Sequence, residues 1–130
     1  MILVDSSVWI DYFNGKVNAQ TDFLHMSLGT EIICTGDLIM TEVLQGFTSD
    51  TSYFEAKDFF EDLYFFHLGG KELAYSTAEN FRFLRKKGIT IRKTIDSVIA
   101  TFCIKNNIQL LHNDKDFEPF VTHLGLKSIF

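Results

Sequence analysis

Met1-Ile2-Leu3-Val4-Asp5-Ser6-Ser7-Val8-Trp9-Ile10-Asp11 opens the chain, and this stretch decides the fold. The apolar run that begins it is typical of a short buried strand, and Asp5 closes that run. The residues from 7 to 13 then predict a helix. A strand that passes through a carboxylate into a helix indicates an α/β sheet, where ligands bind beyond the carboxyl ends of the strands.

The rest of the chain alternates between short apolar runs bounded by turn residues and longer helical patterns. We expect strands at residues 1–5, 31–34, 65–68, 109–112 and 127–129, and helices at 7–13, 19–28, 37–47, 51–64, 71–87 and 94–106. Asp37 and Thr94 are candidate N-caps, and Gly88 and the pair Asn106-Asn107 are candidate helix ends. Alternating strands and helices predict a parallel sheet covered on both faces.

Length and composition favour a single domain over residues 1–130, with an apolar fraction of 46% and 14 Phe to build its core. Cys34 and Cys103 are far apart among apolar neighbours, which indicates reduced core thiols and a cytoplasmic location. The first residues lack the basic and apolar regions of a signal peptide. No apolar run approaches the ~20 residues of a membrane span, so we expect no membrane association.

The net charge of −5 argues against a protein that coats nucleic acid by bulk electrostatics. It does not exclude an enzyme that cuts nucleic acid, because a metal ion would offset some of the acids. Half of all Lys and Arg fall between residues 82 and 93. Arg82, Arg85, Arg92 and Lys93 can hold RNA phosphates, and the alternative is a solvated helix end and loop.

Four acids lie in apolar settings, where acids are seldom buried without a positive partner. They are Asp5, Glu42, Asp96 and Asp114. Asp5 and Asp114 follow predicted strands, whereas Glu42 and Asp96 lie on the inward faces of predicted helices. Hard oxygen ligands suit Mg²⁺ or Mn²⁺, and such a set can bind a phosphodiester and activate a water. The four His are scattered and show no zinc-site spacing.

Each acid alone has a plainer interpretation. Asp5 can cap the helix that follows it, and Asp96 can be a first-turn acid favoured by the helix dipole. Glu42 can be a buried ion-pair partner, while Asp114 and Asp116 can form a turn. The metal hypothesis therefore depends on all of them meeting at one place.

At these residues the chain resembles the PIN-domain family, in particular the VapC-type toxins of VapBC toxin–antitoxin systems. The resemblance rests on the opening Ile2–Ile10 stretch, the Glu42 segment, Thr94–Ala100, and Leu110–Phe117 with its Asp-x-Asp-Phe motif. These pieces come in the family's order and span nearly the whole chain. His112 departs mildly from the pattern, since relatives often have Thr at that position.

The resemblance implies a three-layer α/β/α domain with a central parallel sheet of four to five strands. It implies a Mg²⁺-dependent endoribonuclease (or one using Mn²⁺) that acts on an RNA substrate, forms a homodimer and is inhibited by a cognate VapB-like antitoxin. Asp5, Glu42, Asp96 and Asp114 fall on the family's catalytic and metal-binding acids. Ser7 falls where a hydroxyl orients the first acid or a metal-bound water, and Asp116 is a supporting fifth acid.

Three other functions compete with this one. The main alternative is a catalytically silent PIN-like module that binds a protein partner, although an inactive descendant need not keep four acids. A phosphatase of the haloacid dehalogenase type would need a second Asp where Ser7 stands. A response-regulator receiver would need an acidic pair at the first strand, which Ser6 does not supply.

The Phe-rich segments also allow two interpretations. The six at issue are Phe59, Phe60, Phe65, Phe66, Phe81 and Phe83. They cannot all face one core on elements of this length, so some can cover a homodimer or antitoxin surface. Base stacking is a further alternative. Trp9 is expected in the core.

Overall fold

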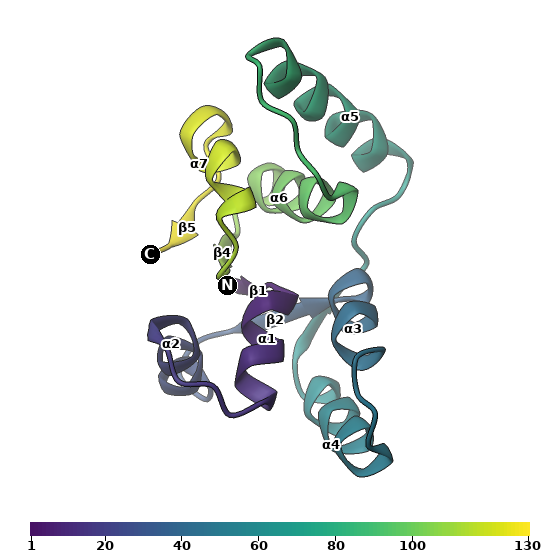
Figure 1. Cartoon of the computed structure of the whole chain (residues 1–130), viewed down its shortest axis with the longest axis vertical. Coiled ribbons are helices and arrows are strands. Elements are labelled where there is room, and N and C mark those ends of the chain that lie inside the picture. The colour runs from purple at the N-terminus through teal and green to yellow at the C-terminus, as the bar shows by residue number, and fades with distance from the viewer.

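Five parallel strands form one central sheet in the computed structural model, which describes residues 1–130 throughout. The strands are β1 (Ile2–Val4), β2 (Ile33–Gly36), β3 (Tyr64–Phe66), β4 (Gln109–Leu111) and β5 (Ser128–Ile129). Their order across the sheet is β3-β2-β1-β4-β5, so the first strand lies at the centre (Figure 1). The predicted parallel sheet is confirmed, with five strands.

Helices cover both faces of this sheet (Figure 1). One side carries α1 (Ser6–Phe13), α2 (Ala19–Ser27), α3 (Asp37–Leu44) and α4 (Asp50–Glu61). The other side carries α5 (Lys71–Lys86), α6 (Thr94–Asn106) and α7 (Glu118–Leu124), which a short 3₁₀ turn at Lys115–Phe117 precedes. The three-layer α/β/α architecture is therefore confirmed.

Strand β1 is completely buried because it has a neighbour on each side and helices on both faces. Leu3 pairs with Cys34 of β2 and with Leu110 of β4, and Val4 pairs with Leu111. This register places the residues after β1 and β4 side by side, and the Asp5 amide donates to the Leu111 carbonyl at 2.9 Å. Two segments more than a hundred residues apart in sequence therefore end at the same edge.

Aromatic packing fills the core beside α1. Trp9 is fully buried, as expected, and stacks on Phe13 with ring centroids 5.7 Å apart. Phe60 meets the same Trp9 ring edge-on at 5.3 Å. Phe65 and Phe83, in contrast, are 42% and 43% exposed, so the prediction that the Phe-rich segments cannot all face one core is confirmed.

Several local predictions were wrong. Helix α7 is absent from the predicted elements. Pro119 was a signal for it, because the backbone N–H groups in the first turn of a helix have no partner within the helix and proline, which lacks an N–H, is tolerated there. The N-caps of α3 and α6 are Gly36 and Lys93 rather than the following Asp37 and Thr94. Asp37 instead uses its carboxylate to accept from the backbone amides of Leu38 and Leu68, each at 2.9 Å.

Element boundaries also moved. Strand β2 begins at Ile33, two residues later than expected. Helix α4 ends at Glu61 rather than at residue 64, and strand β3 starts at Tyr64, one residue earlier than expected. The two predicted helix ends are confirmed: Gly88 after α5 has φ +81°, and Asn107 caps α6 at φ 54°. Both therefore occupy the left-handed region that ends helices. None of the helices combines the length and apolar character needed to cross a bilayer.

Candidate functional site

Asp5 stands where β1 passes into α1, and the structure shows the first of the two roles considered for it, the N-cap. Its Oδ2 accepts from the Ser7 amide at 3.0 Å and from the Ser7 hydroxyl at 2.6 Å, which caps the helix. Its Oδ1 is buried and has no hydrogen-bond partner. Burial is the main cause that raises the pKa of Asp5, against the hydrogen bonds from Ser7. One oxygen of this carboxylate is therefore committed to the fold and the other is left free.

Ser7 links the ends of the two central strands. Its hydroxyl donates to Asp5 and accepts from the backbone amide of Asn113, which follows β4, at 3.1 Å. The side-chain hydrogen of a serine can serve only one acceptor, so this arrangement fixes its direction toward Asp5. The expectation that Ser7 orients the first acid agrees with this geometry.

Asp96 comes to the same edge from the first turn of α6. Its side chain is 4% exposed, and its Oδ2 is buried without a partner. Burial, followed by the charge of Asp5, raises the pKa of this carboxyl from its usual 3.8 to about 7, although Lys93 opposes the shift. Asp96 thus resists ionisation until a positive charge compensates it.

Glu42 reaches the site from α3. It is half-buried and accepts a 3.3 Å hydrogen bond from the hydroxyl of Ser6. Burial and then the charge of Asp5 raise the pKa of Glu42. Sequence reasoning gave Ser6 no role, and its position beside Ser7 in the opening motif was the one signal that could have suggested it.

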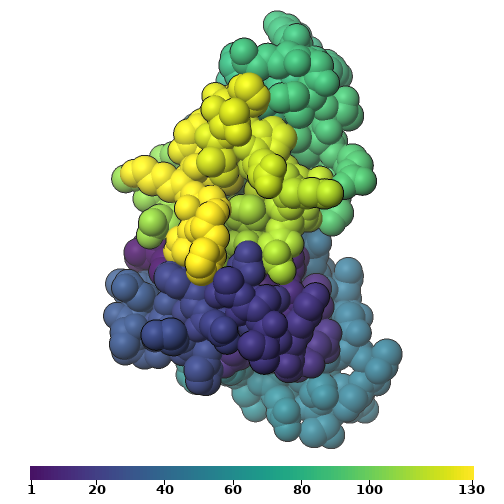
Figure 2. All heavy atoms as spheres, turned by 60° about the vertical axis from the view of Figure 1, so that its left-hand side comes forward, coloured from purple at the N-terminus to yellow at the C-terminus, as the bar shows by residue number.

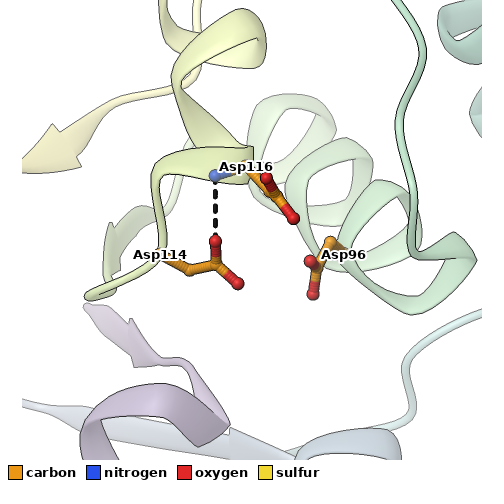
Figure 3. Close-up of side chains that lie close together, drawn as sticks. All are labelled: Asp96, Asp114 and Asp116. Atoms are coloured by element: carbon orange, nitrogen blue, oxygen red, sulfur yellow. Dashed lines mark hydrogen bonds between the residues drawn. The ribbon is translucent and has the colours of Figure 1, made fainter.

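Asp114 and Asp116 complete the arrangement from the turn after β4. Asp96, Asp114 and Asp116 each place one carboxylate oxygen within 4.8 Å of the others. Figure 3 shows these three carboxylates turned toward a common space. The backbone amide of Asp116 donates a 2.9 Å hydrogen bond to Oδ1 of Asp114. The charge of Asp114 also contributes to the raised pKa of Asp96.

Two of the predicted RNA-binding cations lie at this cluster. Arg92 donates from Nη2 to both oxygens of Asp116, at 3.1 and 3.3 Å, and the Lys93 ammonium lies 3.5 Å from Asp114. Arg82 and Arg85 lie instead on α5, where the Arg85 guanidinium sits 5.7 Å from the Phe81 ring centroid. A contact of these four side chains with RNA stays a prediction.

The donor set fits a divalent metal ion. It consists of carboxylate oxygens alone, which hard cations prefer. Asp5 and Asp96 each keep one buried oxygen without a partner, and buried polar atoms are rarely left so. The cluster within ligand distance consists of Asp96, Asp114 and Asp116, and Asp5 and Glu42 lie outside it. The charges of Asp5 and Glu42 contribute to the raised pKa of Asp96, and their sharing of one metal ion with the cluster stays a prediction.

The PIN-domain family model matches residues 2–120. This chain belongs to the PIN-domain family. Among curated relatives of this PIN domain, VapC ribonuclease Mb1587 of Mycobacterium bovis and ribonuclease VapC11 of Mycobacterium tuberculosis are each 26% identical over 130 residues. Those alignments cover 98% of the present chain and 97% of each relative. The resemblance to VapC-type proteins is thereby confirmed.

Solved structures share the fold of this PIN domain. The crystal structure of VapBC2 from Rickettsia felis, bound to a DNA fragment from the promoter, gives a TM-score of 0.78 at 17% identity, covering 99% of this chain and 98% of that one. VapC20 of Mycobacterium tuberculosis, described as a sarcin–ricin loop cleaving toxin, gives 0.68 at 16% identity, covering 91% and 93%. At these identities the likeness carries the fold alone.

Proposed function

We propose that this PIN-domain chain is a metal-dependent endoribonuclease, the toxin of a type II toxin–antitoxin system, which hydrolyses RNA phosphodiester bonds. The observation that carries the proposal is the pair of buried, partnerless carboxylate oxygens on Asp5 and Asp96. Evolution has little reason to bury two acids this way in a purely structural module, because each destabilises the fold without a cation. The kinship with VapC ribonucleases supports the same reading.

The roles of the acids follow from their positions. Asp5 and Asp96, the most buried, would be the principal ligands of Mg²⁺ or Mn²⁺. Glu42 and Asp114, which are half-buried, would hold metal-bound waters or a second ion and orient the attacking water. When bound, the ion supplies positive charge that activates water and stabilises the departing oxygen. Ser7 holds Asp5 in one orientation throughout.

Asp116 would act from further out. Arg92 donates to both carboxylate oxygens of Asp116, and the Asp116 backbone amide donates to Asp114. Asp116 would therefore mainly stabilise the turn that positions the Asp114 carboxylate. Arg92 and Lys93 have side chains that are 75% and 61% exposed. Exposed ion pairs contribute little to stability, so these cations can leave the acids and meet RNA phosphates when substrate arrives. Arg82 and Arg85 would extend the same phosphate contacts along α5.

A cognate VapB-like antitoxin and a second copy of the chain are the proposed protein partners. Several structures that share this fold are VapBC complexes. The present chain also exposes large aromatic side chains that a partner can cover, among them Phe54 at 56% and Tyr64 at 51%. The proposed setting for this activity is the cytoplasm, where the two buried thiols stay reduced.

Incubation with total cellular RNA tests the proposal directly. The wild-type chain should produce discrete fragments in Mg²⁺ or Mn²⁺ and none in EDTA. Asp5→Asn should abolish cleavage and yet fold, because Asn is as good an N-cap as Asp for α1. Asp58→Asn on the exposed face of α4 is the matched control and should cleave normally.

A thermal melt separates a nuclease from a silent module. Mn²⁺ should raise the melting temperature of the wild-type chain by several degrees, by mass action on the folded state, and should leave Asp96→Asn nearly unchanged. An Asp5→Asn variant that cuts RNA at the wild-type rate would refute the site assignment. A wild-type chain that neither binds Mn²⁺ nor cleaves would instead be the protein-binding module.

A further inference from the structure

A hollow of ≈ 480 Å³ adjoins the acids on the side of α2. Its wall includes Asp114 of the proposed site, Gln20 of α2 and Phe130. Figure 2 shows this face of the molecule, where the last residues, in yellow, lie against the dark blue of α2. The volume is in the range of sites that hold small organic ligands.

The polar groups around this hollow are suited to recognition. Gln20 and Asn113 contribute amides, each with a donor and an acceptor. Asn113 is also anchored, since its backbone amide binds the Ser7 hydroxyl and its side chain lies 3.4 Å from Asp11. Lys115 belongs to neither of the ion pairs in the structure, unlike the cations that face the acids. His112 and the acid Glu118 complete the lining of the hollow. The wall therefore offers hydrogen-bonding groups and one positive charge, on Lys115, beside the acids Asp114 and Glu118.

Phe130 supplies an aromatic surface beside those groups. Its side chain is 70% exposed, and its ring meets Phe23 of α2 edge-to-face with centroids 5.7 Å apart. That contact holds the ring in place while leaving most of it open. A second hollow of ≈ 190 Å³, lined in part by Ser128, shares His112, Glu118 and Phe130 with the first. The ring thus borders both spaces.

We infer that the larger hollow is a subsite for one unpaired nucleotide of the RNA substrate, whose base stacks on Phe130 while Gln20 and Asn113 read its edge. The inference rests on the proposed function, because the acids beside the hollow would hold the scissile phosphate. Lys115 then meets the neighbouring phosphate. Proteins recognise unpaired bases through this combination of an aromatic platform and edge-directed hydrogen bonds. Bases stacked in a duplex cannot enter it.

Binding is measured first, in the non-cleaving Asp5→Asn background. Single-stranded RNA decamers of mixed sequence are titrated by fluorescence anisotropy, and AMP and UMP are titrated by NMR. Phe130→Ala should weaken decamer binding about tenfold or more, the expected loss of one stacked base. Phe130→Trp retains a stacking face and should bind like the parent. Phe54→Ala removes another exposed ring, 56% exposed on α4 and outside the hollow, and should have no effect.

Cleavage of the same decamers provides the second readout. In the otherwise wild-type chain, Phe130→Ala should raise KM more than it lowers kcat, and Gln20→Ala should change which bond is cut. These outcomes support the subsite. Decamer binding unchanged in Phe130→Ala, with no mononucleotide shifts at Phe130 or Gln20, overturns it.

The two proposals can fail separately. If the wild-type chain cleaves but Phe130→Ala matches it in binding and cleavage pattern, the subsite is wrong and the nuclease stands. If the wild-type chain cleaves nothing, the proposed function is wrong, and the mononucleotide titration still tests the hollow. Loss of antitoxin binding in Phe130→Ala without any loss of RNA binding would show that the hollow receives the antitoxin, and would also overturn the inference.

Discussion

Asp96→Asn should stabilise the metal-free protein, although it removes a residue of the proposed active site. In the folded chain the pKa of Asp96 is raised to about 7, from the usual 3.8 that applies to the unfolded chain. Its stabilising contribution is therefore complete below pH 3.8 and is lost as the pH rises through about 7. Ionising this carboxyl in the folded state at pH 8 costs about 4 kcal/mol.

Most of this loss of folding stability occurs between pH 5 and pH 8, a range in which unfolding can be measured. Between pH 5 and pH 8 the metal-free wild-type protein should lose about 3 kcal/mol, because the folded state binds the proton that the unfolded state has already released. Asp96→Asn should keep about this much stability at pH 8. In a domain of this size that corresponds to a melting temperature roughly 10 °C higher.

The assay is a series of urea or thermal unfolding curves in EDTA from pH 5 to pH 8. Asp5 and Glu42 also have raised pKa values, so the slope of Asp96→Asn should be smaller than that of the wild type without vanishing. Asp58→Asn, on the exposed face of α4, should follow the wild type. A flat wild-type profile, or an Asp96→Asn variant less stable than wild type at pH 8, would refute the argument.

Three further outcomes are expected. Lys93→Ala removes an ammonium 3.5 Å from a site acid and should tighten Mn²⁺ binding severalfold in a calorimetric titration; weaker binding would contradict it. Ser7→Ala frees Asp5 from its 2.6 Å hydrogen bond, should cost about 1 kcal/mol of stability, and should slow RNA cleavage about tenfold; cleavage at the wild-type rate would show that Asp5 needs no orienting hydroxyl. Gly36→Ala places a methyl 2.5 Å from the Leu68 side chain and should cost about 1–3 kcal/mol in urea unfolding, with an unchanged midpoint as the opposing result.

The central parallel sheet was predictable from the sequence because strong local patterns indicate its strands. The meeting of Asp5, Glu42, Asp96 and Asp114 at one metal ion stays a prediction. The apolar run that ends at Asp5 predicts the end of a strand from the local sequence alone. The carboxyl ends of neighbouring parallel strands lie at the same edge of the sheet, which brings the segment after β4 beside Asp5. Helical periodicity predicts that Glu42 and Asp96 lie on the inward faces of their helices. This prediction needs only the local sequence.

Long-range pairings were beyond the same reasoning. Nothing near Arg92 or Asp116 in sequence indicates that they bind each other across 24 residues. Helix α7 was missed because Pro119 resembles a helix breaker when its place in the first turn is unknown. Asp37 looked like an N-cap, yet its carboxylate is used to hold Leu68, a partner that the local pattern does not reveal.

The position of β1 at the middle of the sheet has a consequence for the nascent protein. Strand β1 has no neighbour on one side until β4, about a hundred residues later in the sequence, has been synthesised. The segments that follow β1 and β4 therefore cannot meet on a partly translated chain. If the proposed function is right, a truncated product that lacks β4 should not cleave RNA.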